Sequence, residues 1–386
     1  MDLTSFTAGQ ADCLVTIPGG VAFVPPPLPP RWELTRELVL KDGDARGLIG
    51  ELLGQSRRTE ANLLIAPLRR REAILSNVIE GTYTQVEDVL LGEVTGERPE
   101  TGAETVEVLK TIDAISLGQE LLQSGRPLSS SMILELHALL LRSARGEQRH
   151  PGEYRRVQVY LGSRAGGLSE ARYVPPPPEQ VRPLMDALVQ FAGSGPVYGP
   201  LIDAALLHYQ FEAIHPFEDG NGRLGRALIP LYWLQQGLLD EPVLYLGGYF
   251  AAHRQAYIDH LSRVSFANDW TAWVEFFLTA ATSEARDAVR RLLRVEELMA
   301  RYRALVAAAS RSSVPLRALE TVFTRVYVSA GDIADATSAS FPAARDAIRV
   351  LEGIGLLQPG PRLRGKQYWV ASEIIDELYR LDPAEN

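Results

Sequence analysis

The chain contains 386 residues, enough for two or three domains, and 46% of them are hydrophobic, as in a globular protein. Its formal net charge of -9 argues against a protein built mainly to coat nucleic acid or an anionic membrane. The single cysteine, Cys13, excludes an internal disulfide and a cysteine-rich zinc site and favours a reducing compartment. The sequence lacks a run of eighteen apolar residues and opens without a basic segment leading into an apolar one. We therefore expect a cytoplasmic protein with no membrane span.

Residues 1–31 contain few periodic apolar positions and end in the proline-rich stretch VPPPLPP, which predicts an extended arm rather than a packed element. From Trp32 onward the apolar residues recur every three or four positions, which is the period of amphipathic helices. Helices are predicted at 62–80, 101–124, 129–145, 179–193, 200–213, 223–237, 248–264 and 268–309.

The helical period is interrupted between residues 155 and 174. The segment RRVQVYLG, from Arg155 to Gly162, alternates β-branched and aromatic residues with polar ones, as a strand does. A turn containing Gly166 and Gly167 and the extended stretch ARYVPPPP follow. This pattern predicts one β-hairpin inserted in a helical protein.

The last segment, 312–386, reads as three short helices, the third near Pro342–Glu352, followed by a strand pair around PRLRGKQYWVA. That order is typical of a winged helix-turn-helix. The fold class is therefore mainly α, with an inserted hairpin and a C-terminal winged helix-turn-helix domain. The expected division is an N-terminal arm and helical region at 1–120, a catalytic core at 121–309 and the C-terminal domain at 310–386.

A glycine-rich turn precedes the apolar helix that begins near residue 223. Gly220 and Gly222 permit close approach of the backbone to a ligand, and the free N–H groups of the turn and of the helix start attract anions. Arg223 and Arg226 share one helix face close to this end, where the helix dipole disfavours cations. A polyanionic phosphate between them would explain their position.

Two further side chains complete the loop. Asp219 offers a hard oxygen ligand for Mg²⁺, which commonly takes one or two carboxylates together with phosphate oxygens. His215, four residues earlier, can accept a proton from an attacking hydroxyl near neutral pH. This set suits phosphoryl or nucleotidyl transfer, where positioning and charge neutralisation dominate.

The stretch 215–226, HPFEDGNGRLGR, resembles the signature HPFxxGNGRxxR of the Fic family. The resemblance implies a Fic-like helical core and a protein adenylyltransferase that moves AMP from ATP onto a Ser, Thr or Tyr hydroxyl. It implies that His215 is the base, that Asp219 holds Mg²⁺ and that Phe217 is buried beneath the loop. Nucleotide contacts would come from Gly220, Asn221, Gly222, Arg223, Gly225 and Arg226.

A second motif lies at the end of the helix predicted at 62–80, where Ser76 and Glu80 are four residues apart and Gly81 follows. A carboxylate at a helix C-terminus is disfavoured, so Glu80 calls for a cationic partner. The segment resembles the inhibitory helix motif of Fic proteins, S/T-x-x-x-E-G/N. That resemblance implies that Glu80 pairs with Arg226, blocks the γ-phosphate and holds the enzyme off.

Two weaker similarities concern the walls of the site. In the family, a hairpin called the flap pairs with the target segment, and Val157, Val159 and Leu161 would form that edge here. Residues 247–261 resemble the family helix YIxxNRxxYY that lines the base pocket. Tyr249 matches, whereas His253 replaces the Asn and Ile258 replaces a Tyr, which puts the contacts of this helix in doubt.

Other functions stay open from the sequence. Residues 311–386 contain nine Lys or Arg and ten Asp or Glu. DNA binding through Arg345 and Arg349 of the third helix and Arg362, Arg364 and Lys366 of the wing is an alternative but is not favoured. An enzyme that removes AMP from a modified protein is another. A homodimer is expected only from the family resemblance.

His137, His150, His208 and His260 are expected to be structural, since they lack metal-ligand spacing.

Overall fold

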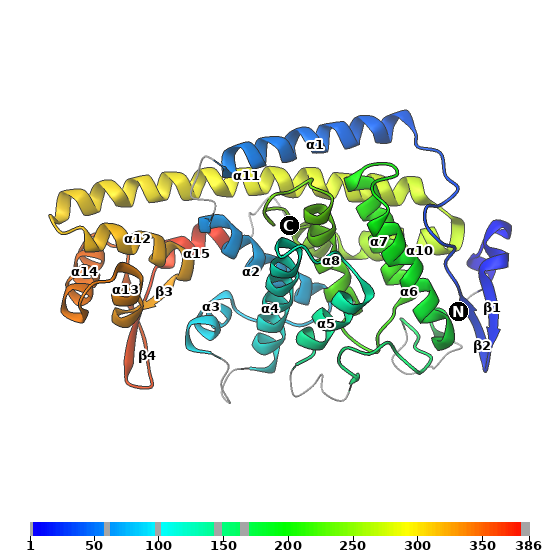
Figure 1. The fold of residues 1–386 in the computed structure, drawn as a ribbon, viewed down its shortest axis with the longest axis horizontal. Helices are drawn as coiled ribbons and strands as arrows, with labels where there is room; N and C mark the ends of the chain where they lie inside the picture. The colour runs from blue at the N-terminus through cyan, green and yellow to red at the C-terminus, as the bar shows by residue number, and fades with distance from the viewer. Residues whose placement is uncertain (1–2, 58–61, 97–101, 143–148, 163–169, 380–386) are drawn as a thin grey trace.

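The computed structural model describes residues 3–57, 62–96, 102–142, 149–162 and 170–379 (Figure 1). Helices dominate this part of the chain, which confirms the predicted mainly α class. The longer helices are α1 (Arg36–Ser56), α2 (Asn62–Ile79), α4 (Ala103–Gln123), α6 (Pro178–Gly193), α7 (Pro200–Ile214), α8 (Asn221–Gln235), α10 (Arg254–Ala267) and α11 (Trp270–Ala309). The shorter ones are η1 (Leu3–Ser5), η2 (Ala8–Cys13), α3 (Val86–Thr95), α5 (Ser130–Leu140), α9 (Gly247–Ala252), α12 (Val314–Arg325), α13 (Ala330–Thr337), α14 (Phe341–Gly353) and α15 (Ser372–Tyr379).

The 40-residue helix α11 runs along the whole molecule, and α1 lies against it (Figure 1). Both helices start at a side-chain cap. The Asp269 carboxylate accepts a hydrogen bond from the backbone N–H of Ala272 at 3.2 Å, and the Thr35 hydroxyl accepts one from Leu38 at 3.3 Å. These caps fix where the two long helices begin.

Helices α7 and α8 pack against each other in the centre of the core. Almost every residue of α7 is buried, because α6, α8 and α11 all pack on it. The indole N–H of Trp273 donates to the Ala205 carbonyl at 2.9 Å and so ties α11 to α7. The loop that joins α7 to α8 therefore stands on a rigid base.

The N-terminal segment differs from the predicted extended arm. Strands β1 (Leu14–Ile17) and β2 (Gly20–Phe23) form an antiparallel hairpin around a turn at Gly19. Phe23 is fully buried, and the Gln10 side-chain amide donates to the Val264 carbonyl at 3.0 Å. The prediction was wrong because the two strands are too short for an apolar period to stand out, while long-range packing stabilises them.

The hairpin predicted at 155–174 forms only one antiparallel bridge, between Leu161 and Tyr173, and residues 163–169 lie outside the described part. The strand expected at 155–162 is absent from the described residues. The facing prolines, which include Pro175 and Pro176, have no N–H to donate to a ladder. Side chains bind the carbonyls instead: the Gln158 amide donates to Pro175 at 2.9 Å.

The C-terminal region follows the predicted order of three helices and a strand pair. Strands β4 (Gln358–Leu363) and β5 (Lys366–Val370) are antiparallel, and β3 (Tyr327–Ser329) pairs with β5, giving the order β3-β5-β4. The predicted boundary at residue 120 falls inside the continuous helix α4. Helix α11 ends at Ala309, where the C-terminal domain was predicted to begin, and it packs on α12, α14 and α15 of that region (Figure 1).

Among the described residues, no helix combines the length and the apolar character needed to cross a lipid bilayer.

Candidate functional site

The loop between α7 and α8 is fixed by its own residues. His215 ends α7 in the left-handed region with φ of 49°, and Gly220 precedes α8 with φ of 79°. The Asn221 side chain accepts from the Phe217 N–H and donates to the Phe217 carbonyl, both at 2.9 Å. Both ends of the Asn221 side chain therefore hold the loop, and the nucleotide contact expected of Asn221 stays a prediction.

Phe217 is fully buried, as expected, and stacks on the His137 ring with centroids 3.6 Å apart. His137 Nδ1 accepts from the Gly152 N–H at 2.9 Å, so its Nε2 donates to the Asp219 carbonyl at 3.1 Å. Burial lowers the pKa of His137 to about 4, which keeps the ring neutral. His137 is a structural residue, as the sequence predicted, and it holds the loop through its contacts with Phe217 and Asp219.

Arg155 holds the other side of the loop and was not predicted. Its backbone N–H donates to Pro216 at 2.9 Å, and its guanidinium donates to the carbonyls of His215 at 2.8 Å and Pro176 at 2.5 Å. The side chain is only 2% exposed. Arg155 thus fixes the backbone of His215 and joins it to the hairpin.

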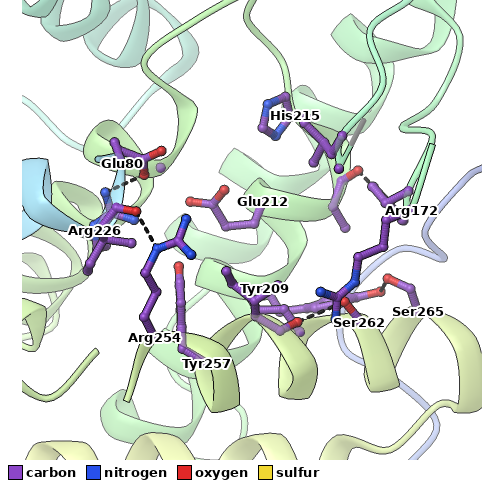
Figure 2. A pocket seen from close by; sticks show the side chains of 18 residues that line it. Glu80, Arg172, Tyr209, Glu212, His215, Arg226, Arg254, Tyr257, Ser262 and Ser265 are labelled. Atoms are coloured by element: carbon purple, nitrogen blue, oxygen red, sulfur yellow. Dashed lines mark hydrogen bonds and ion pairs between the residues drawn. The ribbon is translucent and has the colours of Figure 1, made fainter. Parts of the chain in front are cut away.

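The His215 side chain faces a cavity of about 360 Å³ (Figure 2). Burial and the nearby charge of Arg155 lower the pKa of His215 to about 4, against an ordinary 6.5. The imidazole is therefore neutral at pH 7, which is the form that accepts a proton.

The cavity gathers residues that are far apart in the sequence. Of the predicted residues, it is lined by Glu80, Leu161, His215, Gly222 and Arg226. The sequence did not indicate the other polar groups of its wall, which are Arg172, Tyr173, Tyr209, Glu212, Arg254, Tyr257, Ser262 and Ser265. Periodicity alone cannot find them, because they meet only in the folded chain.

Glu80 and Arg226 form an ion pair on this wall, with Arg226 Nη2 and Glu80 Oε1 2.7 Å apart (Figure 2). Arg226 also donates to the Ser76 hydroxyl at 2.8 Å and to the Ser76 carbonyl at 2.9 Å. Partial burial would raise the pKa of Glu80, but the charge and hydrogen bond of Arg226 hold it below its ordinary value. Glu80 is therefore a carboxylate at neutral pH.

The Glu80 carboxylate also lies directly over the first turn of α8. A Cβ added to Gly222 would collide with Glu80 Oε1. The first N–H groups of a helix attract anions, and here a side-chain anion takes that place. An external anion at the start of α8 would have to displace it.

Arg223 and Asp219 do not line this cavity. Arg223 is 7% exposed and lies between two carboxylates, with Nη1 3.5 Å from Glu107 and Nη2 3.4 Å from Asp219. Glu107 was missed by the sequence analysis and also accepts from the Thr82 hydroxyl at 3.3 Å. Asp219 is half exposed, and its Oδ1 accepts from the Gly220 N–H at 2.6 Å.

Tyr249 and His253 do not line this cavity either, so the base-pocket contacts expected of them stay a prediction. The helix predicted at 248–264 is broken at His253, between α9 and α10. The Tyr249 ring stacks on His253 at 4.1 Å and faces a different cavity, between α1 and α11. Arg254, Tyr257 and Ile258 of α10 take their place on the wall.

The predicted docking edge is only partly at the site. Leu161 lines the cavity, whereas Val157 is 52% exposed and Val159 lies in the same irregular segment. Gly81 closes α2 with φ of 85°, as predicted for a residue just past a helix end.

Comparison with known proteins identifies the class to which this fold and site belong. Residues 127–233 match the model described as "Fic/DOC family", and residues 41–120 match that described as "Fic/DOC family N-terminal". Over these two segments the chain belongs to the Fic/DOC family.

Relatives with established names are similar over part of the chain. "Protein adenylyltransferase Fic" of Aedes aegypti is 33% identical over 146 residues, which are 37% of this chain and 26% of that protein. "Probable protein adenylyltransferase" of Aquifex aeolicus (strain VF5) is 35% identical over 86 residues, 22% of this chain and 27% of that protein. The chain thus spans about a quarter of the length of these curated relatives.

One solved structure is similar over almost the whole chain. It is a Fic family protein from Desulfovibrio desulfuricans G20, with a TM-score of 0.56 and 22% identity, covering 89% of this chain and 98% of that one. The similarity shows that the two chains share a fold.

Proposed function

We propose that this protein is a protein adenylyltransferase, which transfers AMP from ATP to a Ser, Thr or Tyr hydroxyl of a target protein and releases pyrophosphate. One observation carries the proposal: a single cavity gathers a neutral imidazole, the start of α8 at Gly222 and the buried guanidinium of Arg226. The names of the relatives agree with this activity.

His215 is the general base of this proposal. Its neutral ring accepts the proton of the target hydroxyl as the oxygen attacks the α-phosphorus. Arg155 and the left-handed turn at His215 fix the ring's position, so no loop ordering is needed at the moment of reaction.

The start of α8 and Arg226 hold the phosphate chain. The N–H groups of the first turn, at Gly222 and its neighbours, bind phosphate oxygens, and Arg226 neutralises the outer phosphates. Arg223, which pairs with Asp219 and does not line the cavity, contributes a further positive charge. Tyr209, Tyr257, Ile258 and Leu261 line the remainder of the cavity, which suits the adenine ring.

Asp219 suits the Mg²⁺ that accompanies ATP. Its carboxylate is 49% exposed at the edge of the loop, and Mg²⁺ needs only one or two carboxylates besides phosphate oxygens and water. When bound, Mg²⁺ supplies charge neutralisation on the phosphates. Groups of three or more candidate metal ligands do not occur among the described residues, so Asp219 would be the main protein ligand.

We further propose that Glu80 is an inhibitory residue. It holds Arg226 and covers Gly222, the two places where the phosphate chain would bind. Ser76 fixes the same guanidinium from α2. ATP therefore binds productively only after Glu80 moves away. The residues around Leu161 would align the target segment at the mouth of the cavity.

Label transfer tests the enzyme. Purified Glu80→Gly protein is incubated with α-labelled ATP, Mg²⁺ and a cell lysate, beside the parent and Glu80→Gly/His215→Ala. We expect labelled protein bands with Glu80→Gly and a loss of them when His215 is also replaced. Equal labelling with and without His215 contradicts the proposal, and release of label from already modified bands would instead indicate an enzyme that removes AMP.

A DNA-binding role is the second candidate, because arginines are exposed on the C-terminal region. Arg345 and Arg349 lie on α14, and Arg362 and Arg364 lie on β4 and the turn after it. The order of α12 to α14 and the sheet agrees with a winged helix-turn-helix. A gel shift with duplex DNA at low salt tests it, and Arg345→Ala should weaken the shift. A homodimer stays a prediction from the family alone.

A further inference from the structure

Glu212 lies on the last turn of α7 and lines the cavity between the Glu80–Arg226 pair and His215 (Figure 2). Its Oε1 is buried and has no hydrogen-bond partner among the described residues. Its carboxyl lies against the backbone of α8, and a Cβ at Gly225 would collide with Oε1. Gly225 therefore provides the space that Glu212 occupies.

The surroundings disfavour a negative charge on Glu212. Burial raises the pKa of Glu212, the charge of Arg226 lowers it and the charge of Glu80 raises it, and the result is a pKa of about 8. Arg226 is already engaged by Glu80 and Ser76, so it gives Glu212 no direct hydrogen bond. A buried carboxyl oxygen without a partner is far less costly in the neutral acid than in the ionised form.

Several other groups face this part of the cavity, and none of them changes its charge near pH 8. The pKa of His215 is about 4, and burial raises the pKa of Tyr209, Tyr257 and Tyr173 above 10. The remaining charged groups of the wall are Glu80 just after α2, Arg226 on α8, Arg254 on α10 and Arg172. Among the described side chains that line the cavity, Glu212 is thus the one with a pKa raised to about 8; the pKa of buried Glu72, which lies outside the lining and accepts from the Gly247 N–H, is raised to about 7.

We propose that Glu212 is a nucleotide-binding residue that acts as a neutral carboxylic acid and donates its O–H to an oxygen of the bound phosphate chain. The proposal rests on ATP being the ligand of this cavity. A carboxylate in the same place would repel the phosphates, whereas the acid offers a donor at the wall between Arg226 and His215. Loss of the proton from Glu212 therefore weakens ATP binding.

The test is the pH dependence of ATP binding. The dissociation constant of ATP with Mg²⁺ is measured by calorimetry for Glu80→Gly and for Glu80→Gly/Glu212→Gln at pH 7 and pH 9. We expect the affinity of Glu80→Gly to fall over this range, since binding above the pKa of Glu212 requires uptake of a proton. The Glu212→Gln variant keeps an N–H donor that does not titrate, so its affinity should change by less than about twofold.

Three outcomes separate the claims. An equal fall in both variants overturns the role of Glu212. Failure of Glu80→Gly to bind ATP at either pH overturns the proposed function itself. A second perturbation reaches the same carboxyl without replacing it: Gly225→Ala, also in the Glu80→Gly background, should displace Glu212, weaken binding at pH 7 and abolish the difference between pH 7 and pH 9. A pH dependence that persists in Gly225→Ala contradicts the placement of Glu212 beside the phosphates.

Discussion

The carboxylate of Glu80 and the guanidinium of Arg226 meet at 2.7 Å above the first turn of α8, although they are 146 residues apart in the chain. The Arg226 side chain is 2% exposed and the Glu80 side chain 42% exposed, so the cation is buried and the anion lies at the exposed side of the pair. The guanidinium is held by Ser76 as well. If the pair opens, Glu80 is therefore the partner that moves.

Replacing Glu80 with Gly should raise adenylylation by roughly 10- to 100-fold, the equivalent of a charge-assisted hydrogen bond of about 1.5–3 kcal/mol that ATP no longer has to displace. The measurement is the initial rate of AMP transfer at fixed ATP. Glu80→Gln is the matched control, which keeps the size of the side chain and removes its charge. Unchanged rates in both variants would mean that the pair does not restrain the enzyme.

The rate of AMP transfer should stay high in weak acid. Because burial lowers the pKa of His215 to about 4, the neutral base persists well below the ordinary histidine pKa of 6.5. In the Glu80→Gly protein, kcat/KM should therefore keep most of its value down to about pH 5.5 and fall only as the pH approaches about 4. A half-maximal rate near pH 6.5 would contradict this assignment of the base.

Asn221→Ala should destabilise the protein by roughly 2 kcal/mol or more, because it leaves the buried N–H and carbonyl of Phe217 without their hydrogen-bond partners. The measurement is the free energy of unfolding in urea, with Gln158→Ala as a control on a more exposed side chain. If Asn221 instead contacted phosphate, the variant would lose ATP affinity at unchanged stability, and that result would refute the structural role.

Parts of this site were predictable because their residues are adjacent in the sequence. The turn at 219–222 and the histidine before it form one short segment, so their spacing already indicates the chemistry. The contacts of Arg155 and His137 with the loop were not predictable, because these two residues reach it from other segments only through packing. The positions of these residues in the sequence do not indicate that they contact the loop.

Two elements differ from the predicted ones for local reasons, the strand at 155–162 and the helix at 248–264. The strand at Arg155–Gly162 has the right alternation, but its facing segment is made of prolines that cannot donate hydrogen bonds. Tyr249 matches the family pattern, but the helix breaks at His253 and turns that ring toward Phe276, 5.4 Å away between centroids. The apolar spacing at 248–264 is that of one continuous helix, so it did not predict the break at His253.

We expect Arg70 to anchor α2, the helix that ends just before Glu80, to the C-terminal region. It lies on α2, is 7% exposed, and donates to Glu93 at 2.5 Å, to the Thr324 carbonyl at 2.8 Å and to the Tyr379 hydroxyl at 3.2 Å. Arg70→Met should lower the free energy of unfolding by roughly 3 kcal/mol, because it leaves buried partners unpaired.

The control for Arg70 is Arg349→Met, which removes an exposed pair with Asp346 and should cost no more than about 0.5 kcal/mol. Thermal and urea unfolding of both variants make the comparison. Equal effects of the two substitutions would show that α2 is not anchored to the C-terminal region through Arg70.

The most direct test of the central claim is a crystal structure of Glu80→Gly with Mg²⁺ and a non-hydrolysable ATP analogue. The account predicts phosphate oxygens within hydrogen-bond distance of Arg226 and of the N–H groups at the start of α8, with the His215 ring beside the α-phosphate. A phosphate chain bound elsewhere, or a His215 ring turned away from the α-phosphorus, would contradict it.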